Sequence, residues 1–400
     1  MKKLLLLGGL RYLIPVIKTA QELGHYVITC DYLPDNIAHK YSDEYHNVNI
    51  TDKETVLKLA KELQIDGIMS FSVDPGVLTA SYVAEKLELS GCPYRSVEIL
   101  QNKALFRKFL TENGFNVPKA KGYKTFEEAI KEIDIFRFPV IVKPVDSAGS
   151  KGVTKVTGTS ELSQAIDVAL NNSLVAKEFI IEEFIPQYGY SSDTDCFSVN
   201  SNLRFISFSN QYFDNKAANP YTPAAYSWPA TIEFEYQKQL GDELKRLVEL
   251  LNLGTSVYNI EVRVGTDKIP YIMEVTPRGG GNRLSEMLKY ATNTDLIENA
   301  VKAALGEKIE ELSMPTYNGY WAEIILHANK SGCFRGLEIN AKIEKENMIE
   351  ADLWVQPGEQ IQLFNAANDA IGTLVLKFNS QEELQKKMSN VDSWVKVLLE

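Results

Sequence analysis

Cysteine and histidine are scarce in this sequence, with four of each among 400 residues. The eight side chains stand far apart along the chain: Cys30, Cys92, Cys196, Cys333, His25, His39, His46 and His327. Neither set has the spacing that holds zinc or forms a redox couple. We therefore expect no zinc centre, and cysteines that are buried and reduced.

Long apolar runs and an excess of positive charge are also missing. No stretch approaches the roughly 20 apolar residues of a membrane span. The net charge of -11 argues against a general nucleic-acid binder, which needs clustered lysine and arginine. The opening MKKLLLLGGL resembles a signal peptide, but Arg11 interrupts its apolar run and no small-residue cleavage site follows. We expect a buried strand there, a cytoplasmic protein, and no membrane or nucleic-acid partner.

What is present is typical of a soluble globular protein, with 44% apolar and 24% charged residues, enough for two or three domains. The first part of the chain alternates apolar strands with amphipathic helices. Strands are predicted at 3–7, 26–30 and 67–70, and helices at 13–23, 53–63 and 77–87. This pattern indicates an open α/β sheet.

A dinucleotide-binding fold is one alternative for this first sheet. Asp31 follows the Gly8-Gly9 turn by about 20 residues, where an acid would hold a ribose. Against it, the turn lacks the G-x-G-x-x-G spacing that lets a backbone approach a pyrophosphate.

The P-loop pattern G-x-x-x-x-G-K-[ST] is absent, but another loop has the composition of a phosphate site. The run 138–153, FPVIVKPVDSAGSKGV, begins as a buried strand that ends at Lys143. Small residues then leave backbone N–H groups uncovered, and Lys151 adds charge. A common Gly/Ser turn between two strands is the plain alternative.

Residues 102–251 carry several further predicted elements. A helix begins at 102, a strand at 177–185 ends in paired acids, a hairpin surrounds 200–202, and an amphipathic helix covers 234–251. Residues 210–230 are rich in aromatics and show little periodicity, so we predict a long loop that is either functional or a local packing cluster.

Two glutamates interrupt apolar strands in the segments 258–264 and 271–275. A short turn joins the segments, so they form an antiparallel pair that carries Glu261 and Glu274. Adjacent carboxylates repel each other unless a cation lies between them, and Mg²⁺ prefers one or two carboxylates together with substrate phosphates. Two surface or salt-bridged glutamates are the alternative interpretation.

An arginine- and glycine-rich segment follows the second strand. In TPRGGGNR, Arg278 and Arg283 flank three glycines, so exposed backbone donors stand beside two guanidinium groups that can bind carboxylate or phosphate. A solvated turn is the alternative. A helix is predicted at 295–305.

The last 85 or so residues contain strand-like pieces and no obvious site. Strands are predicted at 321–327, 342–344, 360–363 and 372–378, with a closing helix from Gln381. We expect this region to brace the nucleotide domain or to close the substrate pocket.

Taken in order, these features resemble the ATP-grasp superfamily, and in particular its carboxylate-amine ligases. The resemblance covers nearly all of residues 1–305 and implies an α/β and α+β multidomain fold. Its expected parts are an N-terminal open α/β domain (1–115), a mobile lid subdomain (116–185), a catalytic subdomain (186–310) and a C-terminal accessory α+β domain (311–400). The last part is similar to that of the L-amino acid ligases.

The resemblance also implies roles for individual residues. ATP is expected to contact the two lysines, the loop, the adenine hinge and one acid: Lys103, Lys143, Ser147, Ala148, Gly149, Ser150, Lys151, Gly152, Glu182, Glu183, Phe184, Ile185 and Asp193. Metal ligands would be Glu261 and Glu274, holding Mg²⁺ with Mn²⁺ as an alternative. Catalytic roles fall to Arg278 and Lys143, and substrate contacts to Arg278, Gly279, Gly280 and Arg283.

Two positions depart from the family pattern. The family continues Glu-x-Asn after the second glutamate, whereas Thr276 stands here, so a second metal would be held less tightly. The ribose-binding acid is ambiguous between Asp193 and Asp195.

The expected reaction is ATP-dependent ligation of a small carboxylate to an amine through an acyl phosphate, with ADP and phosphate released. One alternative activates bicarbonate to carboxyphosphate. Another, of a different class, is an ATP-binding sensor without turnover. The substrates themselves are not specified by the sequence, and a homodimer is expected from the resemblance alone.

Overall fold

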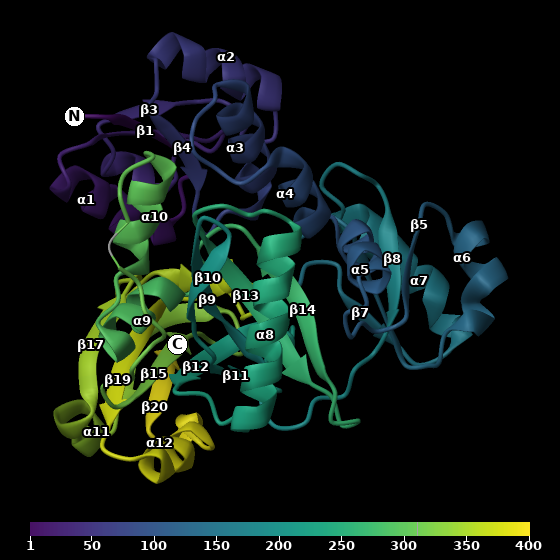
Figure 1. The fold of residues 1–400 in the computed structure, drawn as a ribbon. Helices are drawn as coiled ribbons and strands as arrows, with labels where there is room; N and C mark the ends of the chain where they lie inside the picture. The colour runs from purple at the N-terminus through teal and green to yellow at the C-terminus, as the bar shows by residue number, and fades with distance from the viewer. Residues whose placement is uncertain (310) are drawn as a thin grey trace.

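The chain begins with a parallel sheet in the order β3-β2-β1-β4. The computed structural model describes residues 1–309 and 311–400 (Figure 1). β1 has the sequence KLLLL with all four leucines fully buried, as in a strand covered on both faces. The elements of this unit are β1 (Lys3–Leu7), α1 (Ile14–Glu22), β2 (Tyr26–Cys30), β3 (Glu44–His46), α2 (Lys53–Leu63), β4 (Gly67–Ser70), α3 (Asp74–Lys86), α4 (Tyr94–Gln101) and α5 (Lys103–Glu112). The predicted open α/β sheet is confirmed.

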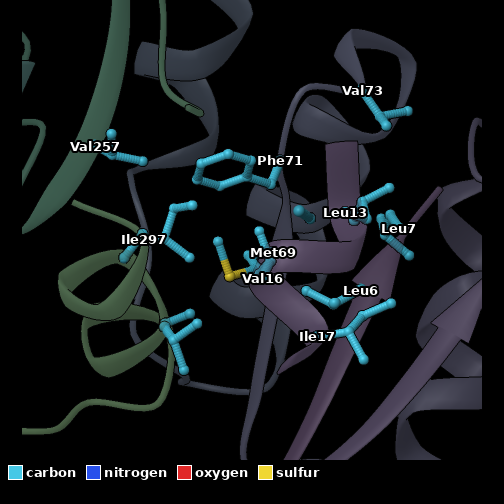
Figure 2. Packing of buried hydrophobic residues seen from close by; sticks show 14 of the residues in the cluster. Leu6, Leu7, Leu13, Val16, Ile17, Met69, Phe71, Val73, Val257 and Ile297 are labelled. Carbon is cyan, nitrogen blue, oxygen red and sulfur yellow. The ribbon is translucent and has the colours of Figure 1, made fainter. Parts of the chain in front are cut away.

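This first unit shares an apolar core with the middle of the chain. Figure 2 shows Met69 and Phe71 beside Val257 and Ile297, all members of one buried cluster. Val257 belongs to β13 (Ser256–Val264) and Ile297 to α10 (Leu296–Ala304), which also packs against α1. The N-terminal sheet therefore packs against β13, which carries Glu261, and against α10, which follows both predicted metal ligands.

A separate antiparallel sheet, β5-β8-β6-β7, lies to one side of the molecule (Figure 1). Alternate apolar residues of β6 and β8 face α7 in a core of their own. The elements are β5 (Ala120–Tyr123), α6 (Phe126–Glu132), β6 (Val140–Pro144), β7 (Thr154–Val156), α7 (Leu162–Asn172) and β8 (Phe179–Glu183). The predicted strand with a lysine at its end is β6.

The central sheet has the order β10-β9-β13-β14 and is antiparallel throughout. The hairpin predicted around 200–202 joins β9 (Ser192–Val199) to β10 (Asn202–Ile206). The predicted glutamate-bearing strands are β13 and β14 (Pro270–Thr276), and the helices are α8 (Phe234–Leu250) and α9 (Leu284–Thr292). α8 packs on β10 and β14.

The prediction of a long loop at 210–230 is wrong. This segment contributes β11 (Asn210–Phe213) and β12 (Pro223–Trp228) to a five-stranded sheet. The sheet order is β11-β12-β15-β19-β17, so strands from both sides of position 310 build it. β12 is almost wholly buried and pairs with β15 about a hundred residues later. Local periodicity fails here because the partner strand is distant in sequence and both faces are covered.

The C-terminal part also differs from prediction at 342–344, which lies in helix α11 and not in a strand. The Asn340 side chain caps α11 by accepting from the backbone N–H groups of Lys342 and Ile343. The remaining elements are β15 (Tyr320–Leu326), β16 (Gly332–Ile339), α11 (Ala341–Glu346), β17 (Met348–Leu353), β18 (Gln360–Ile361), β19 (Gly372–Phe378), α12 (Gln381–Met388) and β20 (Val395–Leu399). Sequence reasoning missed β3, α4, β5, α9, β16, β17 and β20.

Among the described helices, none combines the length and apolar character that a membrane span requires.

Candidate active site

A row of carboxylates crosses the central sheet. Glu261 on β13 stands directly opposite Glu274 on β14 and opposite Asp193 on β9. Directly opposed residues project from the same face, so the predicted pairing of the two glutamates is confirmed. Their side chains keep 34% and 35% of their surface exposed, so the row is open to a ligand.

The row by itself does not complete a metal site. In residues 1–309 and 311–400, no group of three or more His, Cys, Asp or Glu side chains is placed to hold an ion. Two opposed glutamates still fit the donor set of Mg²⁺, which takes its remaining ligands from water and substrate phosphates.

The pKa values of the two glutamates are shifted in opposite directions. Burial, reinforced by the negative charge of Glu274, raises the pKa of Glu261 to about 7 against the opposing charge of Arg263. Burial would also raise the pKa of Glu274, but the positive charges of Lys103 and Lys143 outweigh it and lower that pKa. A cation between the two carboxylates would favour ionisation of both.

Two lysines face this row from neighbouring elements. Lys103 is the first residue of α5, which Asn102 caps, and its Nζ lies 3.6 Å from a Glu274 oxygen. The same Nζ donates to the backbone carbonyl of Ser147, 2.7 Å away, at the start of the Gly/Ser loop. Lys143 on β6 pairs with Glu182 on β8 at 2.5 Å. The structure therefore brings both predicted lysines to one place.

Arg107 is a residue that sequence reasoning missed. Its side chain is 3% exposed, its Nε donates to Glu182 at 2.9 Å, and its Nη1 donates to the carbonyl of Met273, also at 2.9 Å. Glu182 thus lies between Arg107 and Lys143, and Arg107 ties the side sheet to the residue before Glu274. The sequence does contain a signal that could have pointed to Arg107. It lies four residues after Lys103, and this i, i+4 spacing places both side chains on one face of α5.

The Glu182 carboxylate is ionised inside the protein. Burial would raise its pKa, but the charges of Arg107 and Lys143 prevail and lower it to about 2. Its neighbour Glu183 differs, because it pairs with the exposed Arg137 at 2.9 Å. The two neighbouring acids therefore form separate ion pairs: that of Glu182 is buried, and that of Glu183 lies at the periphery.

The Gly/Ser loop 146–152 is held at its start by Asp146 and further along by Ser150, and it turns sharply. Asp146 accepts hydrogen bonds from Ser173 and from three consecutive backbone N–H groups at 174–176. Gly149 and Gly152 have φ values of 65° and 74°, which favour glycine. The Ser150 hydroxyl donates to the carbonyl of Tyr221, 3.2 Å away.

The predicted hinge, Glu182–Ile185, starts in the last two residues of β8 and continues beyond the strand. The N–H of Phe184 donates to the carbonyl of Pro139, and the carbonyl of Ile185 accepts from Arg263 at 3.0 Å. These bonds attach the segment to both the side sheet and β13.

The two candidate ribose acids have different surroundings. Asp193 accepts from Tyr226 and Asn259, each at 2.8 Å, and burial raises its pKa to about 6. Asp195 accepts from the N–H of Gly280 and from Ser285, and it supports the arginine–glycine loop. Asp193 therefore lies beside the metal-ligand candidates.

The loop at 278–283 docks against the N-terminal domain. Arg278 forms a two-pronged ion pair with Asp74, with contacts of 2.8 and 2.9 Å. Ser72 donates to the carbonyls of Gly279 and Gly280. A Cβ added at Gly279 would lie 2.1 Å from the Phe71 ring, so glycine is required for this contact.

Arg283 contacts a different set of groups from Arg278. Its guanidinium contacts Glu286 at 3.1 Å and Glu350 at 2.8 Å, and it donates to Thr373. The two arginines predicted to bind substrate thus occupy separate surroundings.

Comparison with known proteins agrees with this arrangement. Residues 136–286 match the ATP-grasp domain family. The chain therefore carries an ATP-grasp domain, and its α/β and α+β architecture is that of the ATP-grasp fold.

Individual relatives are distant. The carbamoyl phosphate synthase large chain of Pseudothermotoga lettingae is 24% identical over 310 residues, which are 75% of this chain and 26% of the relative. This chain thus spans about a quarter of that protein.

Among solved structures, the L-amino acid ligase of Bacillus licheniformis superimposes with a TM-score of 0.80 at 20% identity, covering 100% of this chain and 99% of the other. The biotin carboxylase domain of the Hydrogenobacter thermophilus 2-oxoglutarate carboxylase, solved with MgADP and bicarbonate, gives 0.76 at 16% identity, covering 100% and 91%.

We predict that Glu182→Gln destabilises the protein by about 3 kcal/mol at pH 7, because it leaves two buried cations without their carboxylate. The folded pKa of Glu182 is lowered from 4.5 to about 2, so its stabilisation is complete above about pH 4.5 and is lost as pH falls towards 2. Urea unfolding at pH 7 and pH 3 should therefore show a smaller difference between variant and wild type at pH 3.

The matched control is Glu183→Gln, which removes a pairing with an exposed arginine and should cost less than about 1 kcal/mol. Equal losses for both variants, or a pH-independent difference for Glu182→Gln, would contradict the assignment of Glu182.

We predict that Gly279→Ala destabilises the protein by about 1–3 kcal/mol, because the new methyl group overlaps Phe71. Gly281→Ala is the control, since a Cβ there meets no atom within 4 Å. Thermal unfolding of both variants, and of Gly279→Ala combined with Phe71→Leu, measures the effect. A loss in Gly281→Ala as large as in Gly279→Ala would show that the loop contact is not the cause.

Proposed function

We propose that this protein is an ATP-dependent carboxylate-amine ligase. The observation that supports the proposal best is the meeting of opposed Glu261 and Glu274 with Lys103 and Lys143 beside one glycine-rich loop. Phosphoryl transfer requires positioning and neutralisation of charge more than a protein nucleophile, and these groups supply both.

In this proposal, ATP lies between the side sheet and the central sheet. The hinge Glu182–Ile185 would meet the adenine, Asp193 remains a candidate for the ribose, and Lys103 and Lys143 would neutralise the phosphates. The loop Ser147–Gly152 would supply backbone N–H groups. Glu261 and Glu274 would hold Mg²⁺ or Mn²⁺, which when bound neutralises phosphate charge.

The proposed reaction has two steps. An oxygen of the substrate carboxylate attacks the γ-phosphorus of ATP, the bond to the leaving ADP oxygen breaks, and an acyl phosphate forms. The amine nitrogen then attacks the acyl carbon, loses a proton, and expels phosphate. Arg278, beside Gly279 and Gly280, would bind the carboxylate or stabilise the transferring phosphoryl group. A closed loop would protect the acyl phosphate from water.

The proposed partners are therefore two small molecules, a carboxylate and an amine, and a homodimer remains an expectation from family resemblance. A second function, activation of bicarbonate to carboxyphosphate, is supported by the fold shared with a biotin carboxylase domain. Formation of ADP that depends on bicarbonate and on no amino acid would favour that function.

We predict that Glu274→Gln lowers phosphate release by about 100-fold or more, because one ligand of the charge-neutralising cation is lost. The measurement is phosphate release with Mg-ATP over a matrix of amino acids, small carboxylic acids and amines. Glu249→Gln, at an exposed site on α8, makes the same change of charge away from the row and should keep wild-type turnover.

Thermal unfolding with and without Mg-ATP accompanies this assay. Full turnover in Glu274→Gln would contradict the assignment of Glu274 as a metal ligand. Stabilisation by Mg-ATP without phosphate release for any pair in the matrix would instead favour an ATP sensor. No stabilisation of the wild type at saturating Mg-ATP would contradict the nucleotide site.

A further inference from the structure

Glu323, in the middle of β15, is a buried acid without a partner. The residue is fully buried, and neither carboxylate oxygen has a hydrogen-bond partner among the described residues. An acid in this position is costly, because burial removes its hydration and no protein donor replaces it. The rest of the described chain does not explain why the position is a glutamate and not an apolar residue.

The strand register shows which way this side chain faces. Glu323 stands directly opposite Tyr226 on β12 and Val375 on β19, and Glu350 on β17 stands opposite Val375. Tyr226 and Val375 belong to the apolar cluster that includes Leu284 and Met287 of α9. The intervening residues Ala322, Ile324 and Leu374 belong to the cluster on the other face. Glu323 therefore projects towards α9 and the loop before it.

The groups on that side carry an excess of negative charge. Arg283 already uses its guanidinium on Glu286 and Glu350, with contacts of 3.1 and 2.8 Å. Glu323 adds a third carboxylate to this one cation. Burial raises the pKa of Glu323 well above its usual value; Arg283 opposes the shift, and Glu286 and Glu350 add to it. With all three carboxylates ionised, this cluster would hold two more negative charges than positive ones.

The cluster also connects to the proposed reaction centre. The Tyr226 hydroxyl donates to Asp193 at 2.8 Å, and Asp193 is opposite Glu261 in the carboxylate row. Asn282 lies between Tyr226 and Tyr12 of the N-terminal domain, with polar contacts of 3.5 and 3.1 Å. Glu286 and Glu350 keep 24% and 33% of their side chains exposed, so the cluster reaches the surface.

We infer that Glu323 receives an ammonium group of one of the substrates. The inference rests on the proposed ligase function and narrows its substrate class. The phenol of Tyr226 separates Glu323 from Asp193, so this ammonium group lies several bonds from the atoms that react. A diamine or a basic amino acid has such a second amine, whereas a monoamine or an aliphatic amino acid of similar length does not.

The test compares pairs of ligands that differ by the remote ammonium group: lysine against norleucine, and 1,5-diaminopentane against pentylamine. Binding is measured by calorimetry on the full-length protein with Mg-ADP present, in wild type and in Glu323→Gln. Glutamine has the shape of glutamic acid without its charge, so this variant should unfold at or above the wild-type temperature. Glu359→Gln, an exposed acid in the same C-terminal part, is the matched control.

Wild type and Glu359→Gln should bind at least one charged ligand about 10-fold or more tightly than its neutral partner, and Glu323→Gln should lose that preference. Equal binding of charged and neutral ligands by wild type, or an unchanged preference in Glu323→Gln, would overturn the inference and leave Glu323 as a protonated structural acid.

Phosphate release measured on the same samples separates this inference from the ligase proposal. A Glu323-dependent preference without phosphate release would support the cation site and count against the ligase. Phosphate release with neutral substrates only, unchanged in Glu323→Gln, would support the ligase and overturn the cation site.

Discussion

The site depends most on the ion pairs that the buried carboxylate of Glu182 forms. It lies between Arg107 and Lys143, and Arg107 also holds the backbone next to Glu274. Four elements, α5, β6, β8 and β14, are thus joined to one another through these buried charged side chains. A buried ion pair is stable only when every charge has its partner, so the positions of these elements are closely coupled.

A second constraint is the opposition of Glu261 and Glu274 across β13 and β14. The strand register places two carboxylates side by side, and adjacent carboxylates repel each other unless a cation lies between them, which is why we propose a cation here. Lys103 and Lys143 offset part of that charge, and they act mainly on Glu274. The unequal pKa values of the two glutamates follow from this unequal distribution of positive charge.

The N-terminal domain contributes to the site through its contact with the loop at 278–283. Asp74 orients Arg278, and Phe71 leaves room only for glycine at position 279. The C-terminal strands contribute differently, because β12 joins their sheet while Tyr226 reaches Asp193. One tyrosine thus connects the carboxylate row to the strand that carries Glu323, so the row and the C-terminal sheet cannot be described separately.

The sequence by itself determined the features that depend on neighbours along the chain. The parallel strands at the N-terminus, the Gly/Ser loop after Lys143 and the opposed Glu261 and Glu274 follow from apolar periodicity, glycine content and a short hairpin turn. The order of these features was also sufficient to indicate the ATP-grasp fold. Tertiary structure alone decided the role of Arg107, the pairing of β12 with β15, and the burial of Glu323. Each of these depends on a partner far away in sequence, and burial, which sets the cost of a charge, exists only once the distant segments have packed together.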